Sequence, residues 1–179
     1  MTAESAVLVP VSDEATRLAA EALIREYLQF IAVTARQQYR LAFDIDAMVA
    51  SDLRDRTKFY PPAGRFYVVR QSSEYVGVGC LKRLAHSVAE LQRMYVRPSA
   101  RGLGAGRALL ERLLSDAREM GFAIVRLESL RALSAAHALY RSAGFREIAP
   151  YDDNSMNAFQ SPDARESYLA SAIFMELRL

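Results

Sequence analysis

A glycine- and arginine-rich segment contains the residues whose types and spacing most clearly point to chemistry. It reads Arg101-Gly102-Leu103-Gly104-Ala105-Gly106-Arg107 and stands between a predicted strand and a predicted helix. Glycines let a backbone approach a ligand closely. The first N–H groups of a helix lack intrahelical partners, and the helix dipole is positive there. The segment therefore predicts a binding site for an anion, most often a phosphate group.

The charges near this segment differ from those of the whole chain. The net charge is only +2, from 23 basic and 21 acidic side chains, which argues against nucleic acid or a membrane surface as a partner. Within fifteen residues that contain no Asp or Glu, however, the sequence places Arg93, Arg97, Arg101 and Arg107. We expect this local excess to bind a phosphate-bearing ligand.

Two other phosphate-binding motifs fit less well. A nucleotide P-loop needs a Gly-Lys-Ser/Thr ending, which the sequence lacks. A dinucleotide fingerprint is matched by Gly102 and Gly104, but Arg107 stands where the third glycine belongs. Glu128 does fall where that fold keeps a ribose-binding acid, although antiparallel strands are predicted before the loop. An ordinary tight turn before a helix is the structural alternative.

Composition sets further bounds. The 179 residues, 51% of them hydrophobic, predict a single domain over residues 1–179 with its own core. Cys80 is the only cysteine, so no internal disulfide can form, and we expect it to be buried in a strand. The two histidines, His86 and His137, do not form a metal-binding pattern, so no metal is expected. No run long enough to span a membrane occurs, and residues 1–11 do not resemble a signal peptide, which predicts a cytoplasmic protein.

Hydrophobic periodicity predicts the elements that position this segment. Helices are expected at 13–33, at 45–53, from the glycine segment to Gly121, and at 134–142 with Ser134 as its cap. The segment 151–168 is polar and is expected to be irregular. Strands are expected at 6–9, 65–70, 75–84, 88–96, 122–127, 145–148 and 172–177. This order predicts a mixed α/β (α+β) sheet that is antiparallel early and parallel where a helix joins two strands.

Two stretches resemble motifs of the GNAT N-acetyltransferase superfamily. Within Glu90–Leu110, the family pattern Gln/Arg-x-x-Gly-x-Gly/Ala is met by Arg101, Gly104 and Gly106. The stretch Ala136-His137-Ala138-Leu139-Tyr140-Arg141-Ser142-Ala143-Gly144-Phe145 resembles the family's Ala-x-x-Leu-Tyr-x-x-x-Gly-Phe. The resemblance covers residues 65–150 and implies a mostly antiparallel, twisted sheet flanked by helices, with central strands splayed at an acetyl-CoA site.

The resemblance also implies how acetyl-CoA binds. Loop amides from Arg101 to Gly106, with Arg107 nearby, take the pyrophosphate. The main chain of Met94, Tyr95 and Val96 pairs with the pantetheine arm. Many family members carry Asn where this chain has Leu133, so one polar contact to the coenzyme is missing here.

Acetyl transfer to an amine needs a base for the ammonium proton and an acid for the leaving thiolate. Tyr140 matches the family's general acid, although its position on a helical stripe also fits a core residue. Glu90 is the first candidate for the base and Glu128 the second; a solvated carboxylate at a strand end is the alternative for Glu90. The acetyl group would pass directly to a primary amine on a small molecule or peptide. The alternative function is a CoA-binding regulatory module without catalysis.

The acceptor itself is not determined by the sequence. The family selects acceptors through the first helices and the loop before the last strand. Here these are 27–43, 60–62 and 151–154. The acidic pair Asp152-Asp153 would suit a cationic amine, whereas Arg36 and Arg40 would suit an acidic acceptor. Homodimers are frequent in the family, so one is possible here.

Overall fold

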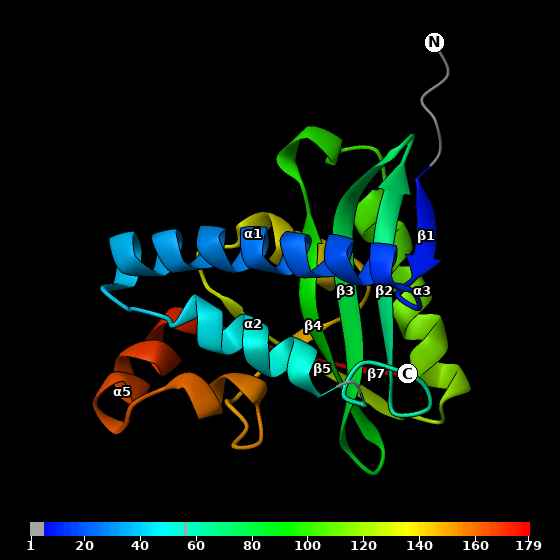
Figure 1. Ribbon diagram of the computed structural model, residues 1–179. Coiled ribbons are helices and arrows are strands. Elements are labelled where there is room, and N and C mark those ends of the chain that lie inside the picture. Colours follow the sequence, from blue (N-terminus) through cyan, green and yellow to red (C-terminus); the bar gives the residue numbers. More distant parts are fainter. Residues whose placement is uncertain (1–5, 56) are drawn as a thin grey trace.

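A seven-stranded mixed sheet forms the centre of the computed structural model, which describes residues 6–55 and 57–179 (Figure 1). Residues 1–5, part of the segment compared with a signal peptide, lie outside that range. The strand order is β1-β2-β3-β4-β5-β7-β6, and only β4 and β5 run parallel, as the fold prediction required. The strands are β1 (Val7–Pro10), β2 (Gly64–Gln71), β3 (Glu74–Ala85), β4 (Val88–Val96), β5 (Ile124–Leu130), β6 (Arg146–Ile148) and β7 (Ala172–Arg178).

The parallel pair β4 and β5 separates after a short contact. Pairing runs only from Val88 opposite Ile124 to Glu90 opposite Arg126. Beyond Glu90, β4 keeps its antiparallel partner β3 on one edge, with Tyr95 opposite Val78. Its other edge is therefore open towards β5 as far as Val96, which agrees with the predicted splaying of the central strands.

Helices cover both faces of the sheet. One core packs beneath α1, α2 and α5, and the second packs beneath α3 and α4. Figure 1 shows α1 and α2 crossing the same face of the sheet. The bounds are α1 (Glu14–Tyr39), α2 (Ile45–Arg54), α3 (Ala105–Glu119), α4 (Ser134–Ser142) and α5 (Pro162–Ser171), with short 3₁₀ turns at Pro98–Ala100 and Ser155–Phe159.

Local interactions set the ends of the first helix. The carboxylate of Asp13 accepts a hydrogen bond from the N–H of Thr16 at 2.8 Å, which confirms the predicted start of α1. The helix runs past the predicted end at residue 33, because Ile31 and Ala35 continue its buried stripe. It ends where Arg40 turns left-handed, at φ 57°.

Three predictions in the second half need correction. Ser134 is the first residue of α4 rather than its cap; Leu133 holds the cap position, without a side-chain hydrogen bond. β5 begins at Ile124 because Gly121, at φ 79°, turns the chain and Phe122 is buried in that turn. The segment predicted to be irregular contains α5, where the Ser161 hydroxyl accepts from the N–H of Ala164 at 3.3 Å.

Two other sequence predictions can be compared with this fold. Cys80 lies on β3 and is fully buried, as predicted, and burial raises the pKa of its thiol. Across residues 6–55 and 57–179, no helix is both long and apolar enough to cross a membrane.

Candidate functional site

A groove of about 500 Å³ opens where the free edge of β4 meets the starts of α3 and α4. All but one of the predicted coenzyme-binding residues line it; they are Met94, Tyr95, Val96, Arg101, Gly102, Gly104, Ala105, Gly106 and Arg107. The exception is Leu103, which is 56% exposed and does not line the groove. The residues predicted to bind the coenzyme are thus brought together along one groove, apart from Leu103.

The glycines set the backbone at the mouth of the groove. Gly102 and Gly104 have φ angles of 80° and 83°, a region that side chains with a Cβ rarely adopt. Gly104 is also the cap of α3, and no side chain hydrogen-bonds to the N–H groups of that helix start. These N–H groups and the positive end of the helix dipole are thus free to bind an anion in the groove.

The sequence suggested that the four clustered arginines bind one ligand together, but the structure separates them. Arg101 and Arg107 line the groove; Arg101 Nε donates to the carbonyl of Val96 at 2.9 Å. Arg97 instead pairs with Glu26 of α1 at 3.0 Å. Arg93 is buried on the far side of β4. Only two of the four therefore contribute to the groove.

A second, smaller cavity of about 60 Å³ lies between the sheet and the helices α1 and α2. Its charged wall is formed by Glu90 and Arg93 of β4 together with Glu128 of β5. Its lining overlaps with that of the groove at five residues, which are Tyr27, Met94, Leu133, Ala136 and Tyr140. The two cavities therefore meet along one shared wall.

Tyr140 stands on this shared wall. It is 6% exposed, and its ring lies 5.8 Å from that of Phe145. Its hydroxyl makes no hydrogen bond to any residue in the described ranges. Burial raises the pKa of Tyr140, so the hydroxyl stays protonated at neutral pH. The structure thus holds a free O–H donor at the point where the cavities meet.

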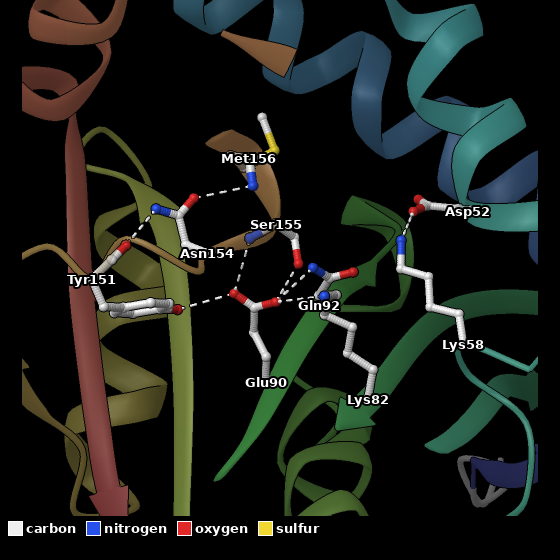
Figure 2. Close-up of polar contacts among 9 residues, drawn as sticks. All are labelled: Asp52, Lys58, Lys82, Glu90, Gln92, Tyr151, Asn154, Ser155 and Met156. Atoms are coloured by element: carbon white, nitrogen blue, oxygen red, sulfur yellow. Dashed lines mark hydrogen bonds and ion pairs between the residues drawn. The ribbon is translucent and has the colours of Figure 1, made fainter. Parts of the chain in front are cut away.

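Glu90 is held in a dense hydrogen-bond network (Figure 2). The side chain is 2% exposed. It accepts hydrogen bonds from the Tyr151 hydroxyl at 3.0 Å, the Gln92 amide at 2.9 Å and the Ser155 hydroxyl. Lys82 Nζ lies 3.5 Å from it. These donors surround the carboxylate and fix its position.

Glu128 has a different environment. It is half-buried, and burial raises the pKa of its carboxyl from 4.5 to about 7, with the negative charge of Glu90 raising it further. Arg93 and Tyr168 act in the opposite direction. A carboxylate with this pKa can accept a proton near neutral pH.

Comparison with known proteins supports the same assignment. Residues 24–145 match the model of the acetyltransferase (GNAT) family. The chain belongs to this family. It is 31% identical over 137 residues to an uncharacterized N-acetyltransferase of Schizosaccharomyces pombe, covering 74% of this chain and 77% of the relative. It is 35% identical over 109 residues to an IAA acetyltransferase of Azospirillum brasilense, covering 60% of this chain and 71% of that relative.

Solved structures agree at the level of the fold. The PaiA N-acetyltransferase from Thermoplasma acidophilum, solved in complex with coenzyme A, superposes with a TM-score of 0.69 at 17% identity, covering 98% of this chain and 99% of that one. The GNAT fold predicted from the sequence is therefore confirmed, and the chain is an acetyltransferase.

Several residues of the GNAT site were not found by the sequence reasoning. Tyr168 lines the smaller cavity, but its sequence context looks like that of a core residue; Tyr27, which lines it too, falls within the range 27–43 expected to select the acceptor. Ser155 is brought to Glu90 by a 3₁₀ turn that the irregular pattern concealed. The acidic pair at 152–153 does not line either cavity; Asp152 is fully exposed and lies 3.3 Å from Arg165.

The titratable side chains of the GNAT site do not form a metal-binding group. Over the described parts of the chain, no three or more His, Cys, Asp or Glu side chains are arranged to hold a metal ion.

Proposed function

We propose that this protein transfers the acetyl group of acetyl-CoA to a primary amine by direct attack of the amine on the thioester. The observation that carries the proposal is the shared wall of the two cavities. A coenzyme in the groove and an acceptor in the smaller cavity would meet at Tyr140. Such proximity turns a bimolecular reaction into one between preplaced groups.

The groove fits acetyl-CoA in two respects. The uncapped N–H groups of α3 suit a pyrophosphate, and Arg101 and Arg107 add positive charge beside them. The open edge of β4 at Met94, Tyr95 and Val96 offers main-chain groups to an extended pantetheine arm. The bound coenzyme would supply an activated acyl group as a thioester.

We assign the proton transfers to Glu128 and Tyr140. Glu128 accepts the proton of the acceptor ammonium, because its pKa of about 7 lets it release and regain a proton near neutrality. The freed amine forms the N–C bond while the C–S bond breaks. Tyr140 donates its hydroxyl proton to the departing sulfur, since its raised pKa keeps that proton in place beforehand. The second proton of the attacking nitrogen, which the new amide must lose, then passes to the Tyr140 phenolate and restores the hydroxyl.

This geometry favours Glu128 over Glu90 as the base. The oxygens of Glu90 are engaged by Tyr151, Gln92 and Ser155, so a proton arriving there would compete with these donors. We infer that Glu90 is a positioning residue. It anchors the 151–155 loop against β4 and raises the pKa of Glu128 through its charge.

Four broader expectations remain proposals of the same kind. Residues 1–179 form one domain, supported by a single sheet that takes strands from both ends of the described chain. The acceptor is a small molecule or a peptide amine. The protein is cytoplasmic, and a homodimer is one assembly open to it. A CoA-binding module without catalysis is the alternative function.

The test combines a binding measurement with an activity screen. Calorimetric titration of the purified protein with acetyl-CoA is expected to show one site per chain. A thiol-release screen over primary amines, amino acids and short peptides is expected to give at least one acceptor, with the N-acetyl product identified by mass. Tight binding without thiol release from any acceptor would leave the regulatory module as the function.

A further inference from the structure

Arg93 occupies an irregular point of β4. Tyr95 pairs with Val78 and Gln92 pairs with Cys80, so the single residue Gly79 of β3 faces two residues of β4. This is a β-bulge, and Arg93 adopts a φ of 55° within it. Positive φ is costly for a residue with a Cβ, and such strain is usually retained where it positions a functional group.

The bulge changes the direction in which Arg93 points. Residues an even number apart share a face of a regular strand. Yet Leu91 and Met94, three apart, both pack on the α3 side of the sheet. The extra residue therefore turns Arg93 to the opposite face, where its Nε donates to the carboxylate of Asp52 of α2 at 2.5 Å.

The balance of charge around Arg93 depends on the protonation of Glu128. Asp52, which has no exposed side-chain surface, is shared between Arg93 and Lys58, whose Nζ lies 2.7 Å away (Figure 2). Glu90 is balanced by Lys82. While Glu128 is ionised, the three carboxylates match the three cations; once Glu128 has taken the proton of the acceptor, the region has three cations and two carboxylates. A bound anionic group would neutralise the remaining charge, which is expensive to bury alone.

Arg93 is also placed to bind such a group. It lines the smaller cavity beside Glu128 and Tyr27. Asp52 engages only the Nε of Arg93. Among residues 6–55 and 57–179, the two terminal nitrogens of Arg93 have no hydrogen-bond partner, and both keep some exposed surface. A guanidinium with two free terminal nitrogens is suited to a planar carboxylate.

The size of the cavity limits what can bind there. Its volume of about 60 Å³ has room for only a few water-sized groups. An ammonium at Glu128 and an anion at Arg93 must therefore belong to a compact molecule.

We propose that the acceptor is a small amino acid whose carboxylate binds Arg93 while its amino group faces Glu128. This inference rests on the proposed acetyltransferase function and narrows its substrate class. Asp52 and Lys58 act as positioning residues, since they fix the guanidinium without touching the acceptor.

Matched acceptors test the proposal. Thiol release would be measured for a panel of α-amino acids, each beside its α-amide and the primary amine that lacks the carboxylate. We expect the carboxylates to have a kcat/KM at least about ten-fold higher, as removal of a charge-assisted hydrogen bond implies. Amides or simple amines that match the amino acids would overturn the proposal and leave the acetyltransferase function intact.

Arg93→Lys supplies the second arm, because it keeps the charge beside Asp52 and removes the planar fork. We expect kcat/KM to fall about ten-fold for amino acids and to change little for amides, with acetyl-CoA binding and Tm retained. Arg97→Lys is the matched control: Arg97 directly follows the end of β4 and pairs with Glu26, but it lines neither cavity. An equal loss for both acceptor classes in Arg93→Lys would contradict the proposal.

A binding readout separates failure of this inference from failure of the proposed function. With CoA bound, amino acids are expected to raise the Tm of the wild-type protein more than their amides do, and Arg93→Lys is expected to abolish the difference. If no acceptor releases thiol but this difference appears, the transferase function fails and the carboxylate site stands. Equal Tm shifts for both ligand classes would refute the carboxylate site.

Discussion

The hydroxyl of Tyr140 is the proposed acid that protonates the leaving sulfur. We expect Tyr140→Phe to lower kcat by roughly 100-fold, the contribution typical of a positioned acid. The ring packing against Phe145 is retained in this variant, so Tm and the dissociation constant of acetyl-CoA are expected to stay near wild type. Steady-state kinetics and calorimetry check both statements. An unchanged kcat would remove Tyr140 from the mechanism.

The two carboxylates differ in their predicted effect on the pH profile. The wild-type kcat should rise with pH through about 7, because Glu128 must be ionised to accept a proton. Glu128→Gln is expected to abolish this limb. Glu90→Gln is expected to keep it but to move the inflection to lower pH, since the Glu90 charge raises the pKa of Glu128. If Glu90→Gln abolished the rise of kcat with pH and Glu128→Gln kept it, Glu90 would be the base.

Tyr140 and the glycine segment could be proposed from the sequence because the spacing of their motifs is local. It ranked Glu90 above Glu128 because burial and the donors around a carboxylate depend on distant segments. Tyr151 and Ser155, which satisfy Glu90, lie more than sixty residues away in the chain. The direction of Arg93 was equally inaccessible, since it depends on a bulge in the pairing with β3.

At the scale of elements, the start of α3 links backbone conformation to binding. We expect Gly104→Ala to cost about 1 kcal/mol of stability, because alanine is strained at a φ of 83°. We also expect it to weaken acetyl-CoA binding several-fold, because relief of that strain moves the N–H groups that face the groove. Chemical denaturation and calorimetric titration measure the two effects.

Gly121→Ala is the control for this prediction. Gly121 has a similar φ of 79°, a Cβ there would meet no atom within 4 Å, and it follows the far end of α3. Its stability loss should match that of Gly104→Ala, with an unchanged dissociation constant for acetyl-CoA. Equal binding losses in both variants would show that the effect is one of stability alone.

The elements themselves were largely predictable. The strand at 88–96 was located to the residue, because its residues form an unbroken run without a turn signal and most of them are buried. β5 was shifted because Phe122, buried in a turn, resembles the first residue of a strand. α5 was missed because its residues are mostly polar, although Ser161 followed by Pro162 is a common helix start.

At the scale of the whole molecule, catalysis and stability make opposite demands on Glu128. Burial raises its pKa from 4.5 to about 7, so the folded protein holds this proton more tightly than the unfolded chain does. Below pH 4.5 both states are protonated and the group costs nothing. Between pH 4.5 and about 7 the unfolded chain ionises while the folded protein keeps its proton, so stability falls; above about 7 both states are ionised and the loss is complete.

Glu128→Gln removes that charge. We expect this variant to be more stable than wild type by about 2 kcal/mol at pH 8, and the gain to shrink towards zero as the pH falls to 4.5. Urea unfolding at several pH values measures it. Glu176→Gln is a suitable control, because Glu176 lies 2.9 Å from Arg126 in the same sheet and its loss should destabilise the protein. A Glu128→Gln variant less stable than wild type at pH 8 would mean that this carboxylate is held for structure rather than for its proton.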